Sequence, residues 1–548
     1  MAMTGTSTNV PESAGWLSRE RIIAKPGFNR WLVPPAALAI HLCIGMSYGL
    51  SVFWLPLARA VGISNPVACP ADSTLVTRLF ATSCDWKVTD LVVVFTIGIV
   101  LLGLSAAAFG GWLERAGPRK AGAIAALCWG GGFILGAIGV YLHQLWILWV
   151  GMGLIGGVGL GLGYISPVST LVKWFPDRRG MATGMAIMGF GGGAMIGSPL
   201  ANILINHFRS PTSVGVAETL LVMGCLYVVC MLIGAFGYRV TPDNWQPDGW
   251  SPPPADAAHA LITRGNVHLD DAHKTPQFWL IWFALFLNVS AGIGVLSVAS
   301  PMLQEIFAGS LIGQPGVAFG QLDMTQKVAV ATVAAGFVGL LSLFNIGGRF
   351  FWATLSDYIG RKMTYFAFFG LGIVLYALAP SFAHMGSKVL FVAAMCIILS
   401  MYGGGFSTLP AYLADIFGTR FVGAIHGRAL TAWGAAGIAG PLLIGIVHDL
   451  QISAGVPRAL VYDRTLYILV AFLAVGFICN ALVRPVHSRW MMKEETVSGE
   501  AAVATRKQSY GIDMGRLDGP AIIAWLLVGI PILWGVYNTL TSAIRIFV

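Results

Sequence analysis

The sequence predicts an all-helical membrane protein made of two six-helix bundles and one additional C-terminal helix. Hydrophobic residues make up 56% of the 548 residues and charged residues only 10%, a balance that excludes a soluble protein of this length. Thirteen apolar segments of about 20 or more residues are long enough to cross a bilayer. Motifs of the first half recur in the second half, which is typical of two related bundles.

The apolar segments are separated by short polar stretches and fall at 31–58, 91–113, 121–142, 145–172, 181–205, 217–237, 277–307, 328–355, 364–384, 389–414, 424–448, 465–484 and 520–545. The only long, proline-rich polar interior stretch, "TPDNWQPDGWSPPPADAA", predicts a linker between the bundles. The predicted division is an N-terminal tail (1–30), a first bundle (31–237), a linker (238–276), a second bundle (277–485), a second linker (486–518) and an extra transmembrane helix with its tail (519–548).

The positive charges follow the predicted topology. Most of the 33 Lys and Arg residues fall in the N-terminal tail and in every second loop after it. The positive-inside rule therefore predicts a cytoplasmic N-terminus and, with an odd number of spans, a C-terminus outside. The net charge of +9 is explained by this placement, and we expect no nucleic-acid partner.

Two motifs are repeated between the halves. "GGWLERAGPRKAG" (110–122) and "WATLSDYIGRKM" (352–363) each place an acid at a helix exit, a glycine three residues on, and then basic residues. The acids, Glu114 and Asp357, are 243 positions apart in the numbering. "KWFPDRRGMATG" has its counterpart in "DIFGTRFVGAIHG", which begins at Asp415; Gly184 matches Gly427 at the same offset of 243, and Phe175 matches Phe417 at 242. This repeat supports two bundles of the same design.

Arg349 is a charge within an apolar segment. It lies eight residues before Asp357, which places it roughly 12 Å inside the hydrocarbon if Asp357 marks its edge. A charge at the bilayer centre costs on the order of 2.5–3.5 kcal/mol on insertion scales and is usually functional. A guanidinium stays charged and binds a carboxylate with two parallel hydrogen bonds, so Arg349 is a candidate anion-binding residue. The alternative is that Arg349 pairs with a carbonyl group of a neighbouring helix or caps a gate.

The combination of these features resembles the major facilitator superfamily. Within it, "GYISPVSTLVKWFPDRRGMATG" and "NIGGRFFWATLSDYIGRK" are similar to the oxalate/formate antiporter family, which is related to the monocarboxylate transporters. The resemblance covers about 31–485 and implies a carboxylate site between the bundles. It places Arg349 in this site and implies an aromatic cage formed by Tyr48, Tyr164, Tyr402 and Phe406. Each aromatic residue could instead serve packing.

The chain departs from the related families at two positions. Trp433 stands where oxalate exchangers carry a second cation, so one positive charge favours a monocarboxylate over the oxalate dianion. Asn345 stands where proton-coupled relatives carry an aspartate four residues before the arginine. His41 is the remaining deep titratable group that we identify in the sequence, and we interpret it as a packed neutral histidine. Proton-coupled monocarboxylate symport is the alternative function to anion exchange.

The resemblance also implies a charge relay between the bundles. It would contain Glu114, Arg115, Arg119, Asp357, Arg361 and Lys362.

Cys69 and Cys84 share the first external loop, where they form either a disulfide or two free thiols. We expect no metal or cofactor, no enzymatic activity and a monomer. The resemblance further implies a multi-pass protein of a bacterial inner membrane that carries small carboxylate anions.

Overall fold

The computed structural model describes residues 15–63, 67–70, 72–242, 245–247, 250, 261–263, 265–492 and 518–546. Within these ranges the chain forms helices and no strand. Thirteen helical segments of the described chain are long and apolar enough to cross a membrane, and each overlaps one of the predicted segments. Most of the predicted 486–518 linker and parts of the 1–30 tail, the 238–276 linker and the C-terminal tail lie outside the described residues.

The first bundle contains six of the spans and a short helix in the loop after the first span. Two short 3₁₀ helices, η1 (Glu20–Ile22) and η2 (Arg30–Leu32), precede it. Its elements are α1 (Val33–Ile44), η3 (Gly45–Phe53), α2 (Trp54–Leu57), α3 (Leu75–Phe80), α4 (Val88–Ala116), α5 (Pro118–Tyr141), α6 (Leu145–Leu148), the π-helical η4 (Trp149–Ile155), α7 (Gly156–Trp174), α8 (Arg179–Phe208) and α9 (Val216–Gly237).

The second bundle repeats this plan and is followed by the extra helix. Its elements are α10 (Leu269–Ala272), α11 (Pro276–Phe307), η6 (Ala308–Ile312), η7 (Phe319–Gln321), α12 (Met324–Ile359), α13 (Arg361–His384), α14 (Lys388–Phe417), α15 (Val422–Ala429), α16 (Thr431–Ser453), η8 (Arg458–Leu460), α17 (Asp463–Leu482) and η9 (Ser488–Trp490). The extra helix is α18 (Gly519–Ala543), which ends in η10 (Ile544–Ile546).

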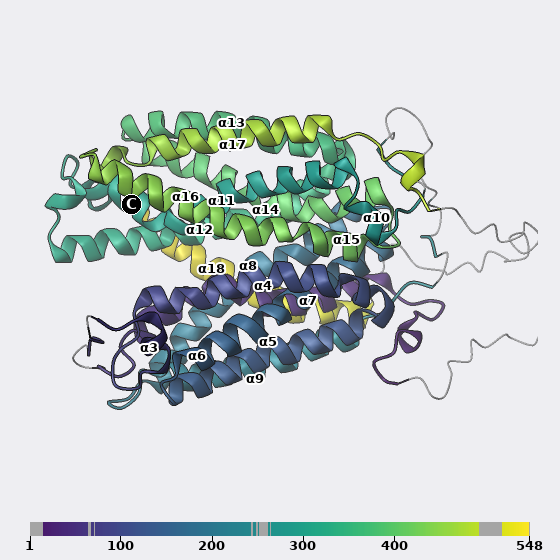
Figure 1. The fold of residues 1–548 in the computed structure, drawn as a ribbon, viewed down its shortest axis with the longest axis horizontal. Helices are drawn as coiled ribbons and strands as arrows, with labels where there is room; N and C mark the ends of the chain where they lie inside the picture. The colour runs from purple at the N-terminus through teal and green to yellow at the C-terminus, as the bar shows by residue number, and fades with distance from the viewer. Residues whose placement is uncertain are drawn as a thin grey trace, which may run out of the picture.

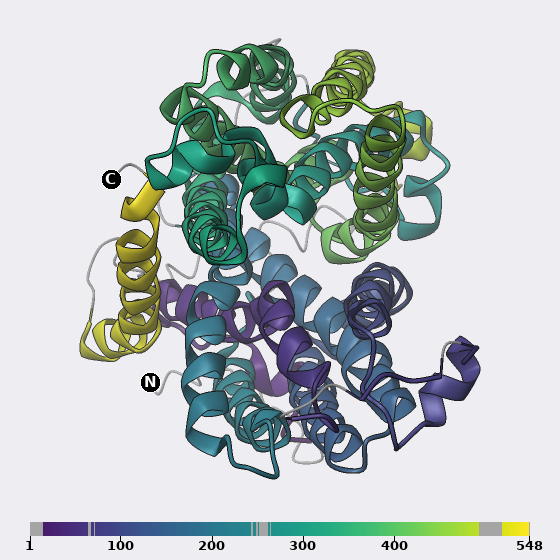
Figure 2. The same ribbon diagram turned by 90° about the vertical axis from the view of Figure 1, so that its left-hand side faces the viewer.

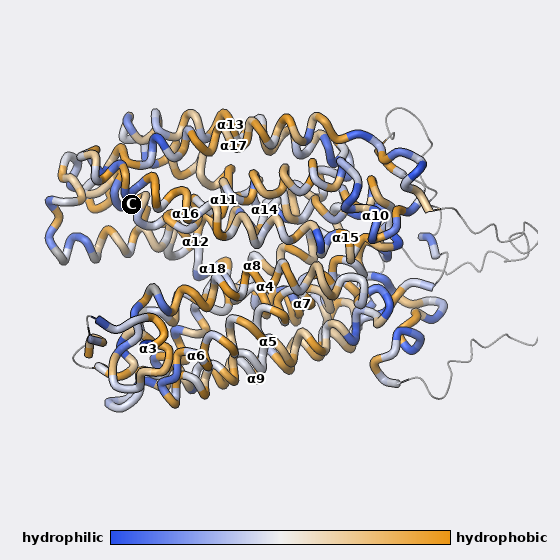
Figure 3. The backbone as a smooth tube through the Cα atoms, viewed as in Figure 1, coloured by the Kyte–Doolittle hydropathy of each residue, from blue (hydrophilic) through white to orange (hydrophobic). Residues whose placement is uncertain are grey.

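The two bundles lie side by side with their helices roughly parallel (Figure 1). Hydrophobic residues dominate the helical part of both bundles, and hydrophilic residues gather at the two ends (Figure 3). We call the end that carries α10 and the linker residues the linker end. The end that carries α3 is the loop end. The bundles meet where α8 packs against α12 and where α4 packs against α15 and α16.

The repeated turn motif sets the ends of corresponding helices. Gly117 ends α4 with φ of +86°, and Gly360 ends α12 with φ of +85°. This backbone conformation is accessible to glycine without steric cost. The next helix starts directly afterwards in both bundles, at Pro118 and at Arg361. The acids of the motif, three residues before each glycine, are therefore held in the last turn of their helices at the linker end.

The seam between the bundles depends on close backbone approach. A Cβ added at Gly184 in α8 would lie 2.8 Å from the carbonyl oxygen of Arg349 in α12. A Cβ added at Gly427 in α15 would collide with the carbonyl oxygen of Ala106 in α4. Both pairs are related by the offset of 243 positions. The same contact therefore occurs twice, once on each side of the pseudo-two-fold axis, and it lets the two bundles approach closely beside Arg349.

Helix α18 lies outside both bundles, at the junction between them (Figure 2). It contacts α8 and α1 of the first bundle and α12 of the second bundle. Gly535 faces Met195 in α8, and Thr539 faces Gly339 in α12. Most of its large apolar side chains are exposed, including Leu527 and Leu533, which suits a helix that faces lipid.

Candidate functional site

Arg349 lies in the middle of α12 and its side chain is fully buried. Its Nε donates a hydrogen bond to Oδ1 of Asn345 at 2.9 Å, and its Nη1 donates to the carbonyl oxygen of Ile187 in α8 at 3.1 Å. Nη2 has no hydrogen-bond partner among the described residues. The acceptors are thus neutral groups from both bundles. A buried charge without a counter-ion is unfavourable, so this position suits an anionic ligand.

Aromatic rings lie on two sides of the guanidinium. Cζ of Arg349 is 5.7 Å from the ring centroid of Phe190 and 5.5 Å from that of Phe406. Trp433 packs on both rings, with centroid distances of 5.3 and 4.5 Å. Cation–π contacts support the charge and leave N–H groups for a carboxylate. Phe190 was not predicted. It is the only aromatic residue of the glycine-rich stretch 184–197, which is the signal that could have identified it.

Tyr48 and Tyr402 connect the two bundles on the loop-end side of Arg349. Tyr48 lies in η3 and Tyr402 in α14, one turn nearer the loop end than Phe406. Their hydroxyl oxygens are 3.3 Å apart. Tyr402 is 1% exposed, whereas Tyr48 is partly exposed. The pair therefore covers the guanidinium on this side and contributes two hydroxyl groups.

Tyr164 and Trp433 add two buried polar groups without partners. The ring of Tyr164 in α7 lies 5.4 Å from Phe190 and 5.4 Å from Trp433. Among the described residues, neither the Tyr164 hydroxyl nor the Trp433 Nε1 has a hydrogen-bond partner. We call the following residues the Arg349 cluster: Tyr48, Tyr164, Phe190, Asn345, Arg349, Tyr402, Phe406 and Trp433.

Two buried histidines adjoin the Arg349 cluster. The Nδ1 of His41 in α1 lies 2.6 Å from the carbonyl oxygen of Ala186, and its Nε2 lies 3.2 Å from that of Tyr164. His426 in α15 has no partner among the described residues for either ring nitrogen. Its ring centroid is 5.9 Å from that of Tyr164. His426 was missed because it lies only four residues into its helix.

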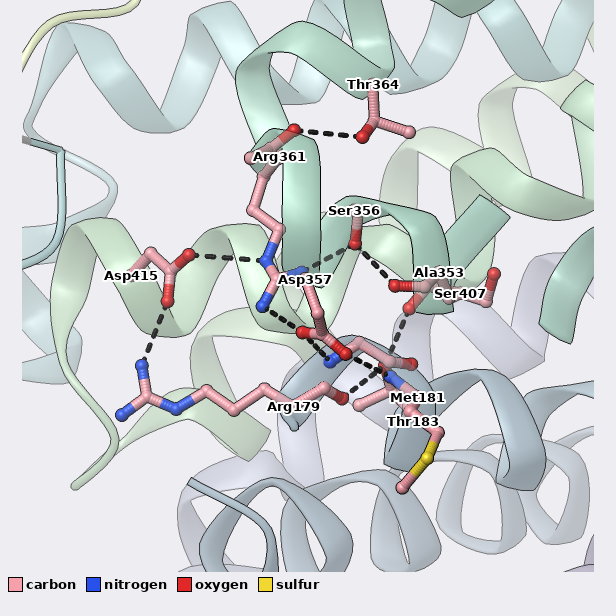
Figure 4. A network of polar contacts seen from close by, with 12 residues as sticks. Arg179, Met181, Thr183, Ala353, Ser356, Asp357, Arg361, Thr364, Ser407 and Asp415 are labelled. Carbon is pink, nitrogen blue, oxygen red and sulfur yellow. Dashed lines mark hydrogen bonds and ion pairs between the residues drawn. The ribbon is translucent and has the colours of Figure 1, made fainter. Parts of the chain in front are cut away.

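A network of polar contacts joins the bundles at the linker end (Figure 4). Asp357 in α12 accepts hydrogen bonds from the backbone amides of Gly180 and Met181 at the start of α8, at 2.9 and 2.8 Å. Arg361 contacts Asp357 at 2.6 Å and Asp415 at 3.3 Å. Because the amides belong to the first bundle and the acids to the second, this network holds the two bundles together.

A further ion pair crosses between the bundles in the same network. Arg179 at the start of α8 donates from Nη1 to Oδ1 of Asp415 in α14 at 2.9 Å (Figure 4). The Thr183 hydroxyl donates to the carbonyl oxygen of Ser407 at 2.8 Å. Arg179 and Asp415 were not predicted as relay residues. Both lie in the second repeated motif, so this repeat is the sequence feature that could have identified them.

The other acid of the repeat makes the equivalent contact. Glu114 in α4 accepts a hydrogen bond from the backbone amide of Gly423 at the start of α15, at 3.1 Å. Gly423 and Gly180 are themselves 243 positions apart. Glu114 also accepts from Ser169 and pairs with Lys173, both in α7. A carboxylate at a helix N-terminus satisfies free amides and interacts favourably with the helix dipole.

Three predicted relay residues lie outside these networks. Arg119 donates to the carbonyl oxygens of Trp16, Phe236 and Tyr238. Lys362 donates to the carbonyl oxygens of Ala481 and Val483 near the end of α17. Arg115 is exposed. Cations are favourable at helix C-termini, which explains why Arg119 and Lys362 bind carbonyl groups instead.

A cavity of about 1630 Å³ opens at the linker end. Residues of both bundles line it, among them Glu114, Arg179, Asp357 and Asp415. None of its described lining residues belongs to the Arg349 cluster. The linker-end networks therefore lie between the Arg349 cluster and this cavity.

Elsewhere in the cavity lining, the neighbouring guanidinium of Arg428 lowers the pKa of the Asp270 carboxyl below its ordinary value.

At the loop end, a disulfide joins Cys69 and Cys84, whose Cα atoms are 5.0 Å apart. The adjacent Asp85 accepts a backbone hydrogen bond from Val67 at 2.8 Å. Arg78 in α3 pairs with Asp90 at 2.7 Å, and this carboxylate raises the pKa of Arg78 above its ordinary value. These contacts tie the first loop to the start of α4.

Comparison with known proteins agrees with the fold. The sequence model of the Major Facilitator Superfamily matches residues 37–441. The chain is 25% identical to the oxalate:formate antiporter of Oxalobacter formigenes, over 84% of this chain and 93% of that protein. It is 27% identical to the apicoplast pyruvate carrier 1 of Toxoplasma gondii, over 71% of this chain and 78% of that protein.

A solved structure has the same architecture. The fucose:proton symporter FucP of E. coli superposes with a TM-score of 0.53 at 15% sequence identity, over 83% of this chain and 100% of that chain. Similarity at this level concerns the fold alone. The family match covers most of the two bundles, and the thirteen apolar helices of the described chain accommodate the same fold plus one helix. The chain therefore belongs to the major facilitator superfamily of membrane transporters.

Proposed function

We propose that this protein is a secondary transporter that exchanges small carboxylate anions by alternating access, with Arg349 as their counter-ion. The observation that carries the proposal is the fully buried guanidinium of Arg349, whose acceptors are all neutral and whose Nη2 has no partner among the described residues. An incoming carboxylate would neutralise this charge and accept its free N–H groups. The similarity to the oxalate:formate antiporter and the pyruvate carrier supports the substrate class.

The charge of the site favours a monocarboxylate. Arg349 supplies one permanent positive charge, and the rings of Phe190, Phe406 and Trp433 lie around it. A second negative charge placed there without a partner is unfavourable. The hydroxyl groups of Tyr48 and Tyr164 are available to the substrate oxygens, so a small planar anion suits the cluster best.

The contacts between the bundles suggest how exchange would work. The Asp357 and Glu114 networks hold the linker end together in this state, and they would separate when the bundles rock to the alternative state. An Arg349 without substrate leaves an uncompensated charge at the midplane, which disfavours reorientation. The bound anion removes this penalty, so we expect exchange to be much faster than net uptake.

The orientation belongs to the same proposal. By the positive-inside rule, the distribution of Lys and Arg supports a linker end in the cytoplasm and a C-terminus outside. A disulfide in the loop-end region suits an oxidising compartment such as a bacterial periplasm. We propose a monomer in a bacterial inner membrane, because one chain supplies every residue of the Arg349 cluster.

Transport by the purified protein tests the proposal. We would measure uptake of labelled formate, lactate and oxalate into proteoliposomes that are empty or preloaded with each anion. We expect uptake to require a preloaded carboxylate and to be lost in Arg349→Gln. Arg489→Gln, an exposed arginine outside the membrane spans, is the matched control and should transport normally.

Two results would contradict this function. Normal exchange in Arg349→Gln would show that the arginine is structural. Uptake of a monocarboxylate into empty vesicles, driven by an inward proton gradient without any trans anion, would replace exchange by proton-coupled symport.

A further inference from the structure

The hydrogen-bond environment of His41 differs from that of an ordinary buried histidine. Its two ring nitrogens face two backbone carbonyl oxygens, Ala186 O at 2.6 Å and Tyr164 O at 3.2 Å. The side chain is fully buried, so water does not replace either partner. Carbonyl oxygens only accept hydrogen bonds, and a neutral imidazole has only one N–H to donate.

This geometry satisfies both nitrogens only in the imidazolium form. A neutral His41 donates to one carbonyl and turns the lone pair of its other nitrogen toward the second carbonyl oxygen. A protonated His41 donates to both carbonyls. The carbonyls belong to α8 and α7, two helices that also carry Phe190 and Tyr164 of the Arg349 cluster. The proton-binding position is therefore built by the same helices as the anion site.

The charged and titratable groups around His41 explain why the proton would depend on substrate. Arg349 of α12 interacts electrostatically with His41. The other titratable neighbours are Tyr164 of α7, whose ring is 5.2 Å away, and His426 of α15. None of these carries a negative charge at neutral pH. An imidazolium at His41 and the guanidinium of Arg349 would repel each other, and an anion bound between the bundles would relieve the repulsion.

We propose that His41 is a titratable second cation of the Arg349 site, so that a protonated site accepts a dicarboxylate and an unprotonated site accepts a monocarboxylate. The inference rests on the proposed function. The charges balance in both cases: one carboxylate group neutralises Arg349, and a second carboxylate group neutralises the imidazolium. The proton comes from water on the open side of the membrane, binds to a ring nitrogen of His41, and is released on the other side with the dianion.

The inference predicts a specificity that changes with pH. We would measure exchange of labelled formate in proteoliposomes at pH 6, 7 and 8, and determine how strongly oxalate and unlabelled formate inhibit it. Carboxylic acids of this type remain ionised over that range. We expect the potency of oxalate relative to formate to rise by at least about fivefold from pH 8 to pH 6, with about tenfold per pH unit as the limit for one linked proton.

Three histidine variants assign the effect to one residue. In His41→Gln we expect formate exchange to continue and the oxalate-to-formate potency ratio to stay at its pH 8 value at every pH. His426→Gln should keep the pH dependence, and so should His384→Gln, an exposed histidine paired with Asp463 at the loop end.

The possible failures are distinguishable. A potency ratio that does not change with pH in the wild-type protein overturns the inference, and this holds even if His41→Gln does not fold. Persistence of the pH dependence in His41→Gln, or its loss in His426→Gln, also overturns it. Absence of any labelled carboxylate exchange in the wild type would instead overturn the proposed function itself.

Discussion

Individual side chains of the Arg349 cluster combine burial with unused hydrogen-bonding capacity. Tyr164 is fully buried and its hydroxyl has no hydrogen-bond partner among the described residues. A buried unsatisfied polar group costs about 1–3 kcal/mol. A bound carboxylate would supply the missing partner, so the Tyr164 hydroxyl is a candidate group for the proposed site.

We therefore expect opposite effects of Tyr164→Phe on binding and on stability. Loss of the hydroxyl would remove the hydrogen bond that we propose to a bound carboxylate, so the KM for exchange should rise by about tenfold, or about 1.4 kcal/mol. The unliganded protein loses an unsatisfied group, so its Tm in detergent should stay the same or rise. Exchange kinetics and a thermal unfolding scan measure the two effects.

Tyr365 is the matched control for this prediction. It is equally buried, but its hydroxyl donates to the carbonyl oxygen of Gly405 at 2.7 Å. Tyr365→Phe should lower the Tm, because it leaves that carbonyl without its partner, and should not change the KM. If the two variants behave alike, the Tyr164 hydroxyl has no role in binding.

At the scale of helices, the packing of α15 against α4 depends on Gly427. A methyl group at this position would collide with the carbonyl oxygen of Ala106. Overpacking of this kind costs about 1–3 kcal/mol. We expect Gly427→Ala to lower the Tm and to slow exchange, because the added methyl group hinders the return of α15 to close contact with α4 at the seam between the bundles.

Gly445→Ala in α16 is the control that separates the effect of the α4–α15 contact from the general effect of replacing a helical glycine with alanine. No heavy atom lies within 4 Å of a Cβ added there, and alanine is favoured over glycine in a helix by up to about 1 kcal/mol. Gly445→Ala should therefore leave the Tm and the exchange rate unchanged or raise the Tm slightly. Equal losses in both variants would argue against a special role of the α4–α15 contact.

Helix α18 is expected to favour the observed arrangement of the bundles, because it packs on α8 of one bundle and on α12 of the other. A Cβ added at Gly535 would lie 3.0 Å from the Met195 side chain in α8, so a larger side chain there would push α18 away from the first bundle. We expect Gly535→Leu to lower the Tm and to leave the KM for carboxylate within about twofold. Gly529→Leu, where no atom lies within 4 Å, is the control and should not change the Tm.

At the scale of the whole molecule, much of the architecture could be predicted from composition and periodicity. The length of an apolar helix is fixed by bilayer thickness, so all thirteen spans were identifiable. The offset of 243 positions was also visible, and it relates Glu114 to Asp357 and Gly184 to Gly427 in the structure as in the sequence. These features depend on local sequence or on internal symmetry.

The partners of the polar residues could not be predicted in the same way. Sequence spacing places Arg119 and Lys362 next to the acids of the repeated turn, but both side chains reach helix carbonyls. Asp357 instead contacts backbone amides of the other bundle, and Arg179 reaches Asp415 across the seam. Such contacts are decided by how two bundles dock, which no local pattern contains.

The pseudo-symmetry of the whole molecule makes a final prediction about the two acids. Glu114 accepts the amide of Gly423, and Asp357 accepts the amides of Gly180 and Met181, each at the start of a helix in the opposite bundle. Glu114→Gln and Asp357→Asn should therefore both favour opening of the linker end. We expect a shift of about 1–2 kcal/mol for each, or roughly five- to thirtyfold in the equilibrium, with the larger effect for Asp357.

A cysteine at Ser407 would report this opening. Ser407 is fully buried and its carbonyl oxygen accepts the Thr183 hydroxyl across the seam. Alkylation of Ser407→Cys by an impermeant maleimide, in vesicles that expose the linker end, should accelerate in both acid variants. Asp449→Asn, an acid on the loop-end side whose side chain is 85% exposed, should not change the rate. If only one of the two acid variants accelerates alkylation, then only one of the two acids helps to close the linker end, and rocking depends on one interface.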